Sequence, residues 1–170
     1  MHVMVATDGI LDAARTASLA ARLAGGDGRV TVLTVVEVPR SILHELRSAA
    51  SPDPVPAEVD IDVEYRHTQA VDAPTGSWVG DDAFVANYVK RVVATRTSEL
   101  VAELEALGPD VEVLGIEGEN ASRSVLAAVN DHSPDVLCVG THGAGLFEGL
   151  LGSLSTKLAR LAPCSVLLIR

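Results

Sequence analysis

DVLCVGTHGAGLFEGLLGS, at residues 135–153, is the stretch that decides how this chain folds. Asp135 opens an apolar run that ends at Val139, which is typical of a buried strand in a parallel sheet. A glycine-rich turn follows, and a short helix is expected to begin near Ser153. Strand, glycine turn and helix in this order form the repeating unit of α/β proteins, which bind ligands at the carboxyl ends of their strands.

The same alternation continues on both sides of this stretch. Further strands are predicted at 3–7, 30–36, 111–116 and 165–169. Helices are predicted at 12–23, 82–107 and, capped by Asn120, up to Ser133. Alternating strands and helices predict an α/β fold with a mainly parallel sheet and helices on both faces. We expect a single domain over residues 1–170.

One segment, residues 41–82, does not follow this alternation. It contains three prolines within residues 51–58, which predict a loop, and an alternating stretch, VDIDVEYRH, typical of a half-exposed strand. Trp78 and Phe84 are expected to pack this segment onto the body. We therefore expect an insert at about residues 52–80.

The composition limits the classes of partner. The chain has 170 residues, of which 48% are hydrophobic, enough for a core of its own. Its formal net charge of −10 argues against nucleic acid and anionic membranes, which are bound through basic patches. Without a secretory signal or an apolar run of about 20 residues, a cytoplasmic protein is expected.

The glycine-rich turn holds the strongest candidate site. Gly140-Thr141-His142-Gly143 is followed by eight residues and then by Gly152-Ser153. Glycines let the backbone approach a ligand, and successive N–H groups can point at one anion. Ser153 is expected to cap the following helix, whose N-terminus attracts negative charge, and His142 to contact a ligand bound there. The alternative is a glycine-rich connection that binds no ligand.

Several other groups carry less chemistry. Cys138 and Cys164 lack CxxC spacing, so neither a redox motif nor a zinc site is expected, and a disulfide between them is not expected. Asp8 has no second acidic residue beside it, which argues against a metal cage. The remaining histidines are expected to be surface or cap residues: His2, His44, His67 and His132.

These motifs together resemble the universal stress protein family. The residues that carry the resemblance are VATDG at 5–9, VTVLTVVEV at 30–38 and GTHG…LLGSLSTKLARLAPCSVLLIR at 140–170. The resemblance implies a five-stranded, doubly wound, Rossmann-like α/β sandwich. It also implies an adenine-nucleotide-binding stress-response protein, with ATP (or AMP or ADP, with or without Mg²⁺) as its ligand and a homodimer formed through the final strand, residues 165–170.

The resemblance also assigns roles to individual residues. Asp8 would contact the adenosine part, with Ala6 and Thr7 lining that edge, and Val35 would lie against the adenine ring. The glycines of the loop would hold the rest of the ligand: Gly140 and Gly143 the ribose and phosphate, and Gly152 with Ser153 the phosphates.

Two departures from the family pattern keep an alternative open. The second spacer has eight residues, from Ala144 to Leu151, where the ATP-binding pattern has nine, and it contains Glu148 but no Arg or Lys. The alternative is a regulatory module that binds no nucleotide and acts through contacts with an unknown protein partner. Catalysis is expected to amount at most to slow ATP hydrolysis, because phosphoryl transfer needs positioned cations.

Overall fold

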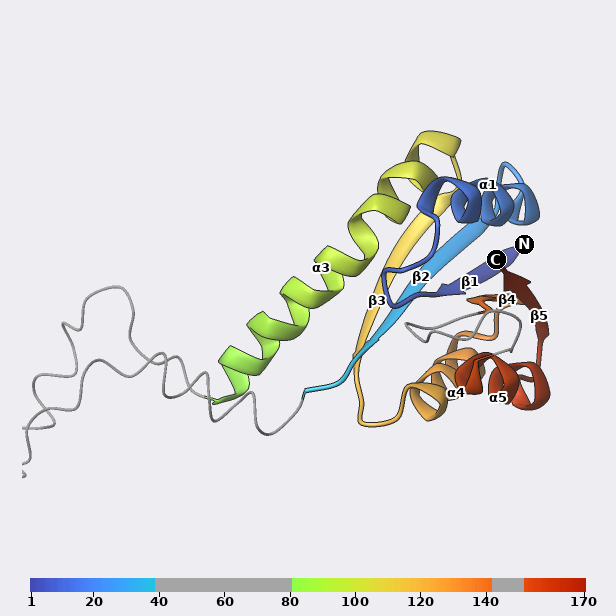
Figure 1. The fold of residues 1–170 in the computed structure, drawn as a ribbon. Helices are drawn as coiled ribbons and strands as arrows, with labels where there is room; N and C mark the ends of the chain where they lie inside the picture. The colour runs from blue at the N-terminus through green and yellow to red at the C-terminus, as the bar shows by residue number, and fades with distance from the viewer. Residues whose placement is uncertain (39–80, 142–151) are drawn as a thin grey trace, which may run out of the picture. The chain divides into compact units, whose positions relative to one another are not determined.

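The computed structural model describes residues 1–38, 81–141 and 152–170, with the backbone alone at 81–84. Figure 1 shows its strands and helices along the chain. The strands are β1 (His2–Ala6), β2 (Arg29–Val36), β3 (Asp110–Glu117), β4 (Val136–Gly140) and β5 (Ser165–Ile169). The helices are α1 (Ala13–Ala24), α3 (Asp81–Leu107), α4 (Ala121–His132) and α5 (Ser153–Leu161).

The chain divides into two compact units. The first comprises Met1–Glu37 and Tyr88–Arg170 and contains the five strands found in the described residues; the second comprises Val38–Asn87. The insert expected at about 52–80 lies outside the described residues, as do Trp78 and the side chain of Phe84. The expectation of a single domain with an insert therefore stays a prediction.

The five strands form one parallel sheet in the order β3-β2-β1-β4-β5. β1 lies at the centre, between β2 and β4, and its register pairs Val5 with Val32 on one side and with Cys138 on the other. This is the doubly wound α/β sheet expected from the sequence. β5 is an edge strand of the sheet, as predicted, with β4 as its neighbour.

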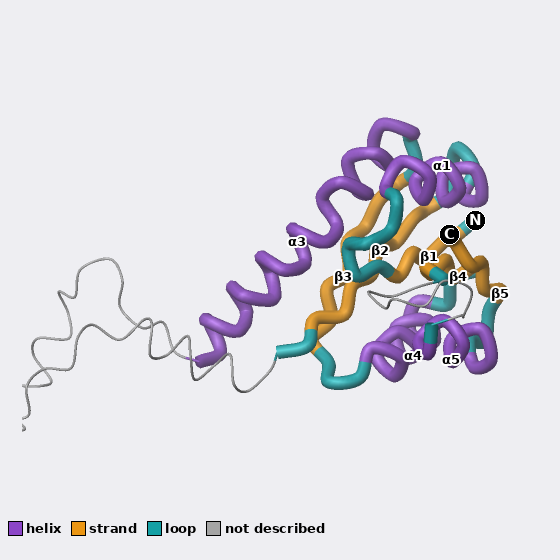
Figure 2. Tube along the Cα trace, viewed as in Figure 1, coloured by secondary structure: helices purple, strands orange, loops and turns teal. Residues whose placement is uncertain are grey.

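Each face of the sheet is covered by a pair of helices, as Figures 1 and 2 show for this unit. On one face, residues of α1 and α3 such as Ala17 and Leu104 form a core with Val5 and Val32. On the other face, α4 and α5 pack on the strand side chains that point away from α1 and α3, among them Leu33. Successive side chains of a strand point to opposite faces, so near-continuous apolar strands fill both cores.

The helix boundaries follow the predicted caps. Asp12 accepts a hydrogen bond from Arg15 N at 2.8 Å before α1, and Asn120 accepts one from Arg123 N at 3.1 Å before α4. α1 ends at Gly25, whose φ is +78°. Such carboxylate or amide caps satisfy N–H groups that have no partner inside the helix.

Gly28 lies where three strands start. Its carbonyl accepts from Asp110 N at 3.1 Å, while Arg29 N donates to Met1 O at 3.1 Å. A Cβ at position 28 would lie 2.1 Å from Ala24 O and 2.8 Å from Met1 O. The first residues of β1, β2 and β3 and the end of α1 therefore meet around a residue that has no room for a side chain.

The two cysteines are free thiols, as expected. Cys138 belongs to the core beneath α1 and α3, whereas Cys164 packs against the core beneath α4 and α5. The sheet separates them. Burial raises the pKa of the Cys138 thiol to about 11.

Candidate nucleotide site at the carboxyl edge of the sheet

The topology creates a switch point between β1 and β4. After β1 the chain crosses to α1 on one face, and after β4 it crosses to α5 on the other. Two neighbouring strands whose connections leave in opposite directions create the switch point at which open α/β sheets bind ligands. The residues that follow β1 and β4 line this point.

The turn after β1 carries the first predicted group. Thr7 N donates to Leu33 O at 2.9 Å, and Gly9 N donates to the Thr7 hydroxyl at 3.0 Å. The Asp8 carboxylate accepts from Ile10 N at 3.2 Å through Oδ1 and is exposed. Gly9 has a φ of +92°, a conformation that favours glycine. These bonds hold an exposed carboxylate at the end of β1.

The second group lies where β4 meets α5. Thr141 N donates to Ile169 O and Gly152 N to Thr141 O, both at 2.9 Å, so the two ends of the glycine loop lie side by side. The Ser155 hydroxyl, which is buried, donates to Gly140 O at 2.5 Å. The structure thus brings Gly140 close to the start of α5. Ser155 was not predicted, because its i+2 position after Ser153 gives no sign that it turns inward.

The start of α5 differs from the prediction in one detail. The N-cap is Gly152, which has no side chain to accept a hydrogen bond, and Ser153 is the first helical residue and is exposed. The prediction that Ser153 caps the helix is therefore wrong. The physical reason is that Gly152 O accepts the first helical hydrogen bond, from Thr156 N at 2.9 Å, which makes Gly152 the N-cap. The first N–H groups of α5 have no cap of the kind that Asp12 and Asn120 provide.

Val35 lies near the end of β2, half-buried against the core beneath α4. A Cβ on Gly118, just beyond β3, would lie 3.6 Å from Val35 Cγ1 and within 2.3 Å of the Ser124 hydroxyl. The contact with Val35 is of ordinary length, so the absence of a side chain at 118 matters only for the close approach of the Ser124 side chain of α4. Among the predicted site residues, His142 and Gly143 lie outside the described residues.

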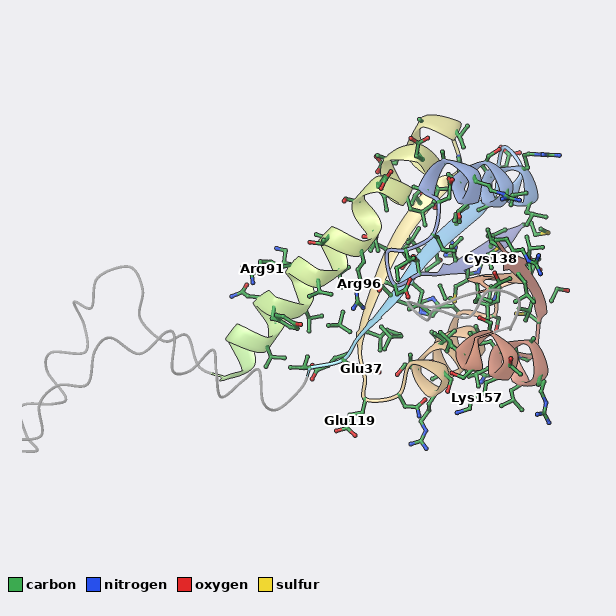
Figure 3. All side chains as sticks on the ribbon, in the orientation of Figure 1. Glu37, Arg91, Arg96, Glu119, Cys138 and Lys157 are labelled. Carbon is green, nitrogen blue, oxygen red and sulfur yellow. The ribbon has the colours of Figure 1, made fainter. Side chains whose placement is uncertain are left out.

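Arg96 is the residue at this edge that sequence reasoning missed. Its Nη1 donates to Val35 O at 2.8 Å, and a Cβ on Gly9 would lie 3.2 Å from its Cα. Figure 3 shows Arg96 on the side of α3 that faces the strands. Sixty-one positions separate Arg96 from Val35, so no local pattern could have indicated this contact.

A separate polar group lies where β1 begins, at the opposite end of this strand from the switch point. His2 Nε2 lies 2.9 Å from the Thr31 hydroxyl, and His2 N donates to the Asp135 carboxylate at 2.7 Å. Burial, followed by the charges of Arg29 and His132, lowers the pKa of His2 below its ordinary value of 6.5. His2 is thus half-buried and hydrogen-bonded, rather than the surface or cap residue expected.

The described part of the chain contains no group of three or more His, Cys, Asp or Glu side chains arranged to hold a metal ion. No helix in that part has the length and apolar character that a membrane span requires.

Comparison with known proteins identifies the family. The universal stress protein family matches residues 1–170, the whole chain, and the protein belongs to that family. A Thermus aquaticus protein, named as a universal stress protein in the 3′ region of a QAH/OAS sulfhydrylase, is 33% identical over 100 residues, covering 57% of this chain and 71% of its own.

Solved structures share the fold at low sequence identity. A universal stress protein in complex with cAMP is 17% identical, with a TM-score of 0.56 over 100% of this chain and 96% of its own. A universal stress protein family protein from Arabidopsis thaliana with AMP bound is 15% identical, with a TM-score of 0.52 over 99% and 90%. These likenesses bear out the five-stranded α/β fold implied by the resemblance.

Proposed function

We propose that this protein binds an adenine nucleotide, AMP or ATP, at the switch point between β1 and β4 and acts as a stress-response regulator in the cytoplasm. The observation that carries the proposal is the pairing of two groups at one switch point. The exposed Asp8 carboxylate lies after β1, and the start of α5, which has no side-chain cap, lies after β4. Two fold relatives that were solved with cAMP and with AMP support this choice of ligand.

The two groups suit opposite ends of a nucleotide. A carboxylate accepts hydrogen bonds from ribose hydroxyls or the amino group of a base. A helix N-terminus attracts a phosphate, because its N–H groups point outward and its dipole favours negative charge. We place the base end at Ala6, Thr7, Asp8 and Val35 and the phosphate end at Gly140, His142, Gly143, Gly152 and Ser153.

The second part of the proposal is that the protein forms a homodimer. β5 lies at the edge of the sheet, and its Leu168 side chain is 37% exposed. Pairing of this edge, residues 165–170, across a two-fold axis would cover it. Nucleotide would change the ordering of the glycine loop, and a protein partner would read that state.

A negative charge at Ser153 tests the phosphate end. In Ser153→Glu a carboxylate would occupy the first turn of α5, where it stabilises the helix by about 0.3–1 kcal/mol but repels phosphate. We expect unchanged folding and at least a tenfold weaker affinity for AMP and ATP by isothermal titration, with and without Mg²⁺. Ala159→Glu is the matched control, since it adds the same charge at an exposed position of α5, six residues further on.

Asp8→Ala tests the base end in the same titration, and it should lower the affinities for AMP and for adenosine by similar factors. Failure of the unmodified protein to bind ATP, ADP or AMP would refute the proposal. It would favour the regulatory module that acts through protein contacts, which the eight-residue spacer and Glu148 support.

A further inference from the structure

The carbonyl group of Val35 lies beyond the last hydrogen bond between β1 and β2. Pairing of β1 with β2 ends at Ala6 and Leu33, and Thr7 N still reaches Leu33 O. Alternate residues of a strand direct their backbone groups to the same neighbour, so the next group facing the β1 side is Val35 O. The β1 chain has turned away by then, because Gly9 N donates to the Thr7 hydroxyl instead.

Arg96 satisfies this carbonyl from the neighbouring helix. Its Nη1 lies 2.8 Å from Val35 O, a short distance that fits a charge-assisted hydrogen bond. The same side chain packs on the turn after β1: a Cβ on Gly9 would lie 3.2 Å from Arg96 Cγ. One residue of α3 therefore touches both the end of β2 and the turn that follows β1.

We propose that Arg96 is a positioning residue for the base end of the nucleotide site, an inference that rests on the function proposed above. Its guanidinium fixes Val35, which would lie against the base, relative to the turn that carries Asp8. Without this bond, Val35 O would lack a partner in a part-buried place, and the end of β2 would shift toward water. At the phosphate end, the bonds from Thr141 N to Ile169 O and from Gly152 N to Thr141 O would remain.

The alternatives to a base-end role are a phosphate contact and a purely structural role. A phosphate contact would affect every ligand that carries a phosphate. A structural role would affect all ligands together, in proportion to the loss of stability. A base-end role would lower the affinity only for ligands that contain the base. Comparing the affinities of two ligands that differ only by the base therefore distinguishes the three roles.

The experiment compares AMP with ribose 5-phosphate, which keeps the sugar and phosphate but lacks the base. Arg96→Met keeps the apolar stem that packs on Gly9 and removes the donor; Arg96→Lys restores one donor. Arg91→Met is the matched control, because Arg91 is exposed and Figure 3 shows its side chain on the opposite side of α3. Isothermal titration measures AMP, NMR titration measures ribose 5-phosphate, and thermal melts check folding.

We expect Arg96→Met to weaken AMP binding about tenfold, the effect of losing a charge-assisted hydrogen bond, and to leave ribose 5-phosphate unchanged. Arg96→Lys should recover most of the AMP affinity, and Arg91→Met should match the unmodified protein. Unchanged AMP affinity in Arg96→Met, or an equal loss of affinity for both ligands, would overturn this inference and leave the proposed function standing. If the unmodified protein binds neither ligand, the proposed function fails and this inference fails with it.

Discussion

Replacement of Gly28 by alanine should destabilise the protein more than any other single methyl group added to the turn between α1 and β2. The new Cβ would lie 2.1 Å from Ala24 O, 2.5 Å from Ala24 C and 2.8 Å from Met1 O. Ordinary van der Waals contacts begin at 3.4 Å, so the first of these is more than 1 Å too short. All three atoms belong to the backbone, and no side-chain rotation can relieve the overlap.

The backbone around Gly28 is also tied by hydrogen bonds. Relief of the overlap would pull Met1 O from Arg29 N, or Gly28 O from Asp110 N, both now at 3.1 Å. Overpacking typically costs about 1–3 kcal/mol, and a weakened hydrogen bond adds about 0.5–1.5 kcal/mol. We therefore expect the free energy of unfolding to fall by about 3 kcal/mol.

Gly26→Ala is the matched control, two residues away in the same turn. A Cβ at Gly26 has no atom within 4 Å, and the position has no positive φ. We expect this variant to be neutral or stabilised by up to about 1 kcal/mol, because alanine has fewer unfolded conformations than glycine. Urea denaturation of both variants measures the difference; values within about 0.5 kcal/mol of each other would refute the reasoning.

Two further predictions concern titratable groups. The pKa of His2 in the folded protein lies below the 6.5 of an ordinary histidine. As the pH falls through 6.5, His2 is therefore protonated in the unfolded chain before it is in the folded one, and the free energy of unfolding decreases. Between about pH 7.5 and about pH 5, the free energy of unfolding measured by urea denaturation should fall less for His2→Gln than for the unmodified protein. An equal fall for the two proteins would contradict this. A water-soluble thiol reagent at about pH 8 should modify Cys164 well before Cys138, which is fully buried with a pKa of about 11. Equal rates for the two thiols in the native protein would count against the placement of Cys138 in the core.

Local patterns were sufficient to predict the elements of this fold. Apolar runs predicted β1, β2 and β4, because inner strands of a parallel sheet are buried on both faces. A strand was also predicted at 111–116, where β3 is an edge strand with several exposed side chains. Asp12 and Asn120 marked the starts of α1 and α4, because their side chains bond to N–H groups only three residues away. The alternation of strands and helices predicted a mainly parallel sheet, and the resemblance carried by residues 5–9, 30–38 and 140–170 implied that it has five strands.

The geometry of the candidate site required the tertiary structure. The order β3-β2-β1-β4-β5 places β1 beside β4, although more than a hundred residues separate them, and so creates the switch point. Gly152 rather than Ser153 is the N-cap of α5, because Gly152 O accepts the first helical hydrogen bond, from Thr156 N.

The sequence by itself determined which segments become strands and helices, since those preferences depend on residues within one or two turns of each other. Only the tertiary structure decided which side chains meet at the carboxyl edge. Arg96 reaches Val35 O because β1 leaves the sheet one hydrogen bond too early to satisfy it, and because Gly9 leaves room for the arginine stem. Both conditions arise from packing between segments far apart in the chain.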